Sequence, residues 1–185
     1  DFINPANITL QKELAHAYFT ADRYPEAVEL YTKLIDAPAP VGRETRVELA
    51  RILLKTRRLT EAKEALMALL ASDASDCIPD LGLATIGVLD PELYSIDVPK
   101  LLKRLTDCQL LARIQTSDTV REWAAVLIRE ILMHPINETG TQLAAGLAEL
   151  TMAGDSPFLI LSRQMLEQYA KHGPKAVQPD IEPML

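Results

Sequence analysis

The sequence is poor in aromatic residues, which make up 5% of its 185 residues, and it has only 7 glycines. Runs of Val, Ile, Thr and aromatic residues, which are typical of β-strands, are missing, whereas Ala and Leu are abundant. An excess of basic residues is also missing, because 26 Asp and Glu outnumber 19 Lys and Arg. The formal charge of −7 argues against a nucleic-acid-binding domain, which needs a basic patch for phosphates. We expect an all-α fold.

The sequence also lacks long apolar runs, which bears on where the protein resides. No run approaches the roughly 20 residues that a membrane-spanning helix requires, so we expect no membrane span. No signal peptide is visible, and the absence of Met before Asp1 indicates a processed chain or a fragment of a longer one. Cys77 and Cys108 lack the C-x-x-C spacing of zinc and redox sites, so we interpret them as structural thiols. This interpretation favours a reducing, cytoplasmic compartment, with the periplasm as the alternative.

Two parts of the sequence repeat each other at a distance of 35 residues. Residues 24–34 match residues 59–69, and a second apolar segment lies upstream of each in the same register. Each unit is therefore predicted to hold two helices. The small side chains of Ala27 and Ala62 are expected where the paired helices cross, because small residues let backbones approach closely. Pro25 suits the first turn of its helix, and Thr60 is the predicted N-cap of the matching one.

The repeated positions resemble the pattern of the tetratricopeptide repeat family. The first unit, about residues 8–41, supplies Leu14, Ala15, Tyr18, Tyr24, Ala27 and Tyr31. The second unit, about residues 43–76, supplies Leu49, Ala50, Leu53, Leu59, Ala62 and Leu66. Pro38 and Pro40 flank the position where the family's first unit would close with Pro. For residues 1–76, the resemblance implies helix-turn-helix repeats that stack as a right-handed superhelix.

Residues 77–173 are predicted to continue the array as divergent helical pairs. Asp97 is expected to cap one long helix that runs to about Ile114, and Ser117 to cap another that ends near Met133. A helical hairpin is expected over about 139–153 and 157–172, with Ser156 as N-cap and Gly173 as terminator. Residues 174–185 contain three prolines, Pro174, Pro179 and Pro183, and no periodicity, which predicts an extended tail.

The sequence contains none of the motifs that would indicate catalysis. It has no Gly-rich phosphate loop, no H-E-x-x-H motif, no nucleophile elbow and no calcium loop. We therefore expect a non-catalytic protein without a cofactor or metal. A metal site built from Cys77, Cys108 and His134 is the alternative that the sequence leaves open.

A partner-binding groove follows from the resemblance, because the first helix of each unit lines the concave surface in that family. The residues expected in this groove are Lys12, His16, Phe19, Val47, Arg51, Leu54 and Lys55. Their basic groups would attract a protein or peptide with acidic groups, and an exposed Phe19 would anchor it. The expected function is a protein-binding scaffold within a larger assembly. One alternative is a helical sensory or oligomerisation module of a larger catalytic or membrane-associated protein, which would self-associate. The others are an independent enzyme and an ordinary surface without a partner.

Overall fold

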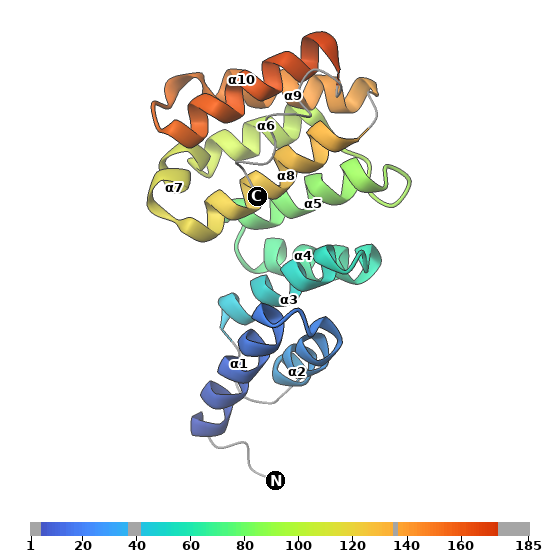
Figure 1. Cartoon of the computed structure of the whole chain (residues 1–185), viewed down its shortest axis with the longest axis vertical. Helices are drawn as coiled ribbons and strands as arrows, with labels where there is room; N and C mark the ends of the chain where they lie inside the picture. The colour runs from blue at the N-terminus through green and yellow to red at the C-terminus, as the bar shows by residue number, and fades with distance from the viewer. Residues whose placement is uncertain (1–4, 37–41, 135–136, 174–185) are drawn as a thin grey trace. The chain divides into compact units, whose positions relative to one another are not determined.

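The computed structural model describes residues 5–36, 42–134 and 137–173. These residues form ten α-helices and one short 3-10 helix, and they contain no strand. The predicted all-α fold is therefore confirmed (Figure 1). The chain divides into a first unit, Asp1–Ala74, and a second unit, Ser75–Leu185. The predictions for Pro38, Pro40 and the tail 174–185 fall outside the described residues.

The first unit consists of two helical hairpins. Helix α1 (Pro5–Thr20) packs against α2 (Tyr24–Asp36), and α3 (Arg43–Lys55) packs against α4 (Leu59–Ser72). Helix α2 also packs against α3, so the two hairpins lie against each other. The second helices begin 35 residues apart, and the predicted helix pairs are confirmed.

The turn within each hairpin has the same backbone structure. Asp22 and Arg57 have φ angles of 58° and 60°, in the left-handed region. The next residues, Arg23 and Arg58, donate their N–H groups over 2.8 and 2.9 Å to the carbonyls five residues earlier. This arrangement ends a helix by satisfying its last carbonyls and usually has Gly at the left-handed position. The repeat therefore extends to individual backbone hydrogen bonds.

An ion pair at the start of the second helix is repeated as well. Nε of Arg23 donates to Glu26 over 2.9 Å, and Nε of Arg58 donates to Glu61 over 2.7 Å. The hydrogen bond from Arg23 lowers the pKa of the Glu26 carboxyl. Thr60 lies inside α4 instead of capping it, so the predicted N-cap is wrong. Residue 58 holds the cap position, and its side chain makes the ion pair instead of a capping hydrogen bond.

Most of the predicted packing residues form the core of the first unit. Eight have at most 8% of their surface exposed: Ala15, Ala27, Tyr31, Leu49, Ala50, Leu53, Ala62 and Leu66. Tyr18 and Tyr24 are half-buried. Leu14 is 46% exposed, so its assignment to the packing set is wrong. Its counterpart Leu49 lies on a helix that packs against α2 as well as α4, whereas α1 packs mainly against α2.

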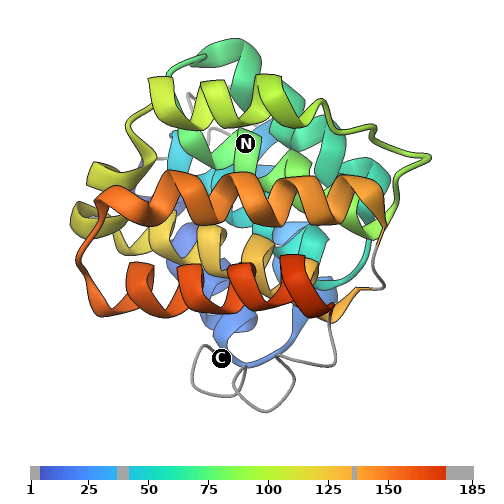
Figure 2. The same ribbon diagram turned by 90° about the horizontal axis from the view of Figure 1, so that it is seen from above.

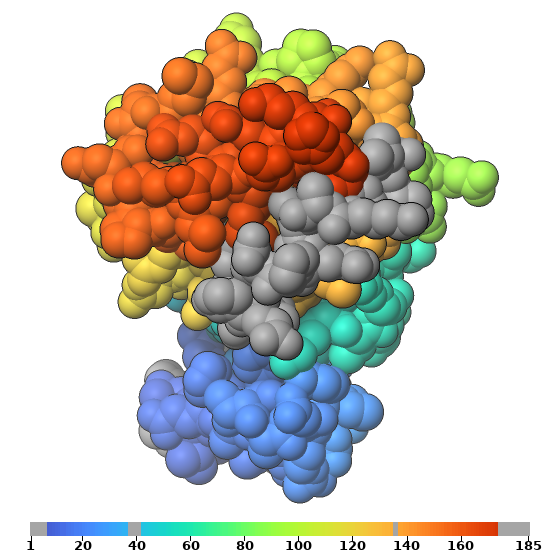
Figure 3. Space-filling model, turned by 45° about the horizontal axis from the view of Figure 1, so that its top comes forward, coloured from blue at the N-terminus to red at the C-terminus, as the bar shows by residue number. Residues whose placement is uncertain are grey.

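The second unit has a different helix arrangement. Its elements are α5 (Cys77–Leu89), α6 (Val98–Asp107), α7 (Leu110–Thr116), α8 (Asp118–Met133), α9 (Glu138–Leu150), the 3-10 helix η1 (Thr151–Ala153) and α10 (Pro157–His172). Helix α5 packs mainly against α8, which is three helices away along the chain. Figure 2 shows α6, α9 and α10 side by side with α8 behind them. Helix α10 covers a broad stretch of this unit's surface in Figure 3.

Several helix ends of the second unit follow the sequence signals. The side chains of Asp97, Ser117 and Ser156 each accept a hydrogen bond from a backbone N–H of the first turn, and Gly173 ends α10 with φ 78°. These predicted caps are confirmed. Asp76 and Asn137 cap α5 and α9 in the same way, although the sequence reading did not identify them.

The single long helix that was expected between Asp97 and Ile114 is wrong. The chain forms α6 and α7 instead, and the break falls at Cys108 and Gln109. Gln109 has φ 57°, a left-handed conformation that cannot continue a right-handed helix. Cys108 is bonded to Cys77, which holds the end of α6 against the start of α5.

Candidate protein-binding surface of the first unit

The predicted groove residues fall into two groups in the structure. Phe19, Val47 and Leu54 are buried, with exposures of 8%, 3% and 7%. Lys12, His16, Arg51 and Lys55 reach the surface to different extents. The expectation of an exposed Phe19 anchor is therefore wrong, and this ring forms the floor beneath charged side chains.

Two cations of α3 lie over aromatic rings of the first hairpin. The guanidinium carbon of Arg51 lies 5.2 Å from the centre of the Phe19 ring, and Nζ of Lys55 lies 5.5 Å from it. Nζ of Lys55 also lies 5.0 Å from the centre of the Tyr24 ring. Cations at these distances are attracted by the negative face of an aromatic ring. Residues of α1, α2 and α3 are therefore brought together at one place.

Carboxylates lie beside both of these cations. Lys55 is 3.7 Å from Asp22, and Arg51 is 3.9 Å from Glu48. The Tyr24 hydroxyl also donates to Asp22. The surface is therefore less basic than the sequence reading expected, because each cation has an acidic neighbour.

Three members of this surface were missed as site residues, namely Asp22, Tyr24 and Glu48. Tyr24 had been assigned to repeat packing alone. Its position five residues after Phe19, across a tight turn, is the signal that could have placed the two rings together. Their ring centres lie 6.0 Å apart. We call His16, Phe19, Asp22, Tyr24, Glu48, Arg51 and Lys55 the α1–α3 surface.

The remaining predicted groove residues lie at the edge of this surface or beneath it. His16 is exposed, and its ring centre lies 6.4 Å from that of Phe19. Lys12 is half-buried one turn earlier on α1. Val47 and Leu54 belong to the core and cannot contact a partner directly. The α1–α3 surface therefore offers cationic hydrogen-bond donors above an apolar floor.

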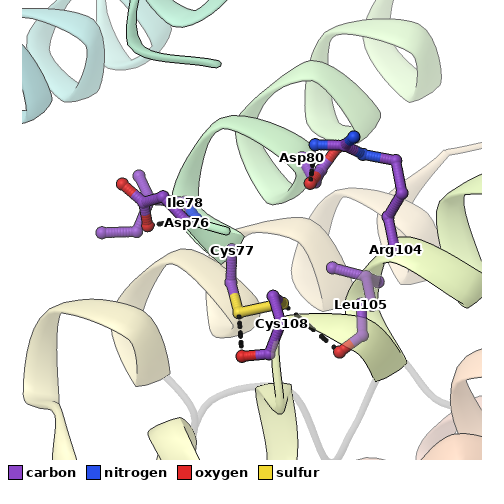
Figure 4. A network of polar contacts seen from close by, with 7 residues as sticks. All are labelled: Asp76, Cys77, Ile78, Asp80, Arg104, Leu105 and Cys108. Atoms are coloured by element: carbon purple, nitrogen blue, oxygen red, sulfur yellow. Dashed lines mark hydrogen bonds and ion pairs between the residues drawn. A yellow bond between two sulfur atoms is a disulfide. The ribbon is translucent and has the colours of Figure 1, made fainter. Parts of the chain in front are cut away.

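The alternative prediction of a metal site with Cys77 and Cys108 among its ligands is wrong. Cys77 and Cys108 form a disulfide, so neither sulfur is available as a thiolate ligand (Figure 4). The interpretation of Cys77 and Cys108 as structural thiols is wrong as well, because both sulfurs belong to the disulfide. Within the described residues, no group of three or more His, Cys, Asp and Glu side chains is placed to hold a metal ion.

A small cavity lies in the second unit among α5, α8, α9 and α10. Its lining includes His134, Asn137, Gly140 and Tyr169, and its volume of about 10 Å³ leaves room for about one water molecule. The Tyr169 hydroxyl donates to the His134 carbonyl over 3.2 Å, and burial raises the pKa of Tyr169. A cavity of this size is far below the several hundred Å³ typical of small-molecule sites.

Comparison of the chain with protein-family models, curated proteins and solved structures gives no match. None of the described helices is both long enough and apolar enough to cross a lipid bilayer. The resemblance to tetratricopeptide repeats therefore stays a prediction that depends on the repeated residues alone.

Proposed function

We propose that the first unit is a non-catalytic protein-binding module whose partner contacts the α1–α3 surface. In this proposal the two hairpins are repeats of the tetratricopeptide class, and their first helices face the partner. The protein acts as a scaffold that holds this partner within a larger assembly. Neither a cofactor nor a metal takes part.

The observation that carries the proposal is the contact between equivalent helices of two matched repeats. Arg51 and Lys55 of α3 extend over the Phe19 ring of α1, so side chains of both first helices form one continuous patch. Stacked helical repeats generate extended surfaces of this kind, on which successive units each contribute a few side chains.

The partner most compatible with this surface is a peptide segment that carries carboxylates. Lys55 can exchange its interaction with Asp22, at 3.7 Å, for a shorter bond to such a segment. Bonds between charged groups are strongest at about 2.7–2.9 Å, so the pair of Lys55 with Asp22 leaves energy to be gained. The side chain of Lys55 is 54% exposed, which gives the segment access to it.

The proposal is tested by capture from native extract with the immobilised full chain and with the double variant Arg51→Glu, Lys55→Glu. We expect the double variant to lose the captured partner, because two reversed charges repel the acidic segment. Lys33→Glu is the matched control, since Lys33 is an exposed cation on α2 outside the α1–α3 surface. Circular dichroism verifies that all three proteins remain helical.

Capture of the same partner by the double variant at wild-type strength contradicts the proposal. The same holds if Lys33→Glu weakens capture as strongly as the double variant does. Raising the salt concentration should weaken the wild-type interaction, because screening reduces attraction between exposed charges.

The disulfide supports a compartment other than the one expected from the sequence. Cys77 is fully buried and Cys108 is 5% exposed, and they are joined within a packed hairpin. Disulfides form and persist in oxidising environments and are rare in the cytosol. We therefore propose an oxidising compartment such as the periplasm or the extracellular space. Thiol labelling of the protein purified without reductant and then denatured should detect no reactive cysteine, and labelling of both thiols would contradict this proposal.

A further inference from the structure

The carboxylate of Asp22 is held by two donors of the α1–α3 surface. The Tyr24 hydroxyl donates a hydrogen bond to Oδ1 of Asp22, and Nζ of Lys55 lies 3.7 Å from the same oxygen. Nζ of Lys55 also lies 5.0 Å from the centre of the Tyr24 ring, and this attraction keeps the two donors together. Donors from α2 and α3 therefore converge on one carboxylate oxygen, which is the arrangement that a carboxylate-binding site requires.

The turn that contains Asp22 does not need these side-chain bonds. The second hairpin has Arg57 and Leu59 at the positions 35 residues after Asp22 and Tyr24. Its turn nevertheless has the same backbone, with φ 60° at Arg57 and φ 58° at Asp22. Each of these two residues donates its backbone N–H over 3.1 Å to the carbonyl three residues earlier. The backbone thus forms the turn without a carboxylate at one position or a hydroxyl at the other.

The Asp22 side chain is free to leave its donors. It is 76% exposed, and the Lys55 side chain is 54% exposed. An exposed ion pair contributes little to stability, because water competes for both groups. Among the described residues, Asp22 supplies the one carboxylate that pairs with Lys55. Another carboxylate can therefore take the place of Asp22 while the fold stays intact.

We propose that Asp22 is an internal competitor for a carboxylate-binding site formed by Lys55 and Tyr24. This role rests on the proposed function of the first unit, since it names the group that an acidic segment displaces from the α1–α3 surface. A carboxylate of the partner accepts the bonds from Lys55 and from the Tyr24 hydroxyl, and the Asp22 side chain turns into the solvent. Because one carboxylate replaces another, a segment needs further contacts with the surface to bind, and this raises specificity.

The opposite role for Asp22 would be to hold Lys55 in position for the partner. The two roles predict changes of opposite sign when the carboxylate is removed. Competition predicts tighter binding of an acidic segment, whereas positioning predicts weaker binding. Asp22→Asn is the suitable change, because Asn removes the negative charge and tolerates the left-handed backbone of this position.

The test measures binding of a fluorescent peptide of alternating glutamate and glycine to the full chain by fluorescence anisotropy at low salt. We expect Asp22→Asn to bind this peptide about threefold more tightly than the wild-type chain, a factor typical of an exposed ion pair. Glu29→Gln is the matched control, because Glu29 is 67% exposed and pairs with Lys33 at 2.6 Å outside the α1–α3 surface. This control removes the same charge and should leave the affinity nearly unaltered.

The role of the Tyr24 hydroxyl is tested in the same assay. On the Asp22→Asn chain, Tyr24→Phe should weaken binding about threefold, because the carboxylate of the peptide loses a donor. On the wild-type chain the same change should have a smaller effect, since Asp22 and the peptide lose the donor alike. Equal effects of Tyr24→Phe on the two chains would contradict competition for this hydroxyl.

Several results would overturn the inference. Asp22→Asn may not weaken binding or leave it unaltered, and Glu29→Gln may not tighten binding as much as Asp22→Asn does, because net charge alone would then explain the change. In these cases the proposed function stands as long as Arg51→Glu with Lys55→Glu abolishes binding of the peptide. Absence of saturable binding up to about 1 mM peptide, to the wild-type and Asp22→Asn chains alike, contradicts the acidic partner itself and the inference with it. Circular dichroism verifies the fold of each variant.

Discussion

The guanidinium of Arg104 on α6 donates two hydrogen bonds, of 2.7 and 2.9 Å, to the carboxylate of Asp80 on α5. The Asp80 side chain is only 7% exposed, and this bond raises the pKa of Arg104. Parallel bonds of this kind are the strongest form of side-chain ion pair. Together with the disulfide they join α5 to α6, as Figure 4 shows.

Replacing Arg104 should therefore destabilise the second unit strongly. We expect Arg104→Ala to lower the free energy of unfolding by about 2–4 kcal/mol, because it leaves a buried carboxylate without its cation. This loss is smaller than that expected for a fully buried ion pair, because the Arg104 side chain is 29% exposed and solvent screens its charge. Urea denaturation measures it. Adding Asp80→Asn to Arg104→Ala should restore part of the stability, and a loss below about 0.5 kcal/mol for Arg104→Ala would contradict the prediction.

At the left-handed turn residue of the second hairpin, we expect a glycine variant to be more stable than an alanine variant. Arg57 has φ 60°, so Arg57→Gly should be more stable than Arg57→Ala by about 1 kcal/mol, since only Gly adopts this conformation without a steric cost. Both variants remove the same side chain, which isolates the backbone effect. At Lys33, inside α2, the order should reverse by a similar amount, because Gly disfavours a helix. Equal melting temperatures for the two variants at position 57 would rule this explanation out.

The disulfide should stabilise the second unit by closing a long loop. Cys77 and Cys108 are 31 residues apart, and a loop of this length corresponds to about 3–4 kcal/mol in the chain-entropy model. Thermal melts of the wild-type protein with and without reductant should therefore differ clearly. The double variant Cys77→Ala, Cys108→Ala serves as the control, because reductant should leave its melting temperature unaltered. Identical wild-type melts in both conditions would show that the bond contributes nothing.

The buried hydroxyl of Tyr31 predicts a loss of stability at high pH. Burial raises its pKa to about 12, with a further contribution from the negative charge of Glu48, whereas an unfolded tyrosine titrates near 10. Below pH 10 both states bind the proton, so the stability contribution of the neutral hydroxyl is complete there. As pH rises from 10 through about 12, the unfolded state ionises first and this contribution is lost. Tyr31→Phe should flatten the fall of the unfolding free energy over that window, and unchanged slopes would exclude a role for Tyr31.

The parts of the fold that were predicted well from the sequence depend on residues close together along the chain. Ala27 and Ala62 are both fully buried where small side chains were expected. Ser117 and Ser156 cap their helices because a side-chain oxygen can satisfy a nearby backbone N–H regardless of the rest of the chain. The helix break at Gln109 was missed because no Gly or Pro marks it.

The candidate surface was predicted only in part, for a related reason. The resemblance grouped Arg51 and Lys55 with Phe19, and both cations do lie over its ring, but it placed Phe19 at the surface. The ring is buried because side chains from α3 extend over it, and that depends on how closely two helices approach. Periodicity along the chain does not determine this distance.

The sequence by itself determined the helical class, the two matched hairpins of the first unit and several helix ends, because these depend on periodicity and on contacts a few residues apart. Only the tertiary structure decided that Cys77 meets Cys108 and that α5 packs against α8. The tertiary structure also decided that Leu14 is exposed while Leu49 is buried, although the two occupy equivalent positions. Burial depends on which other helices pack nearby. Two matching sequence segments can therefore differ in burial when one segment has a neighbouring helix that the other lacks.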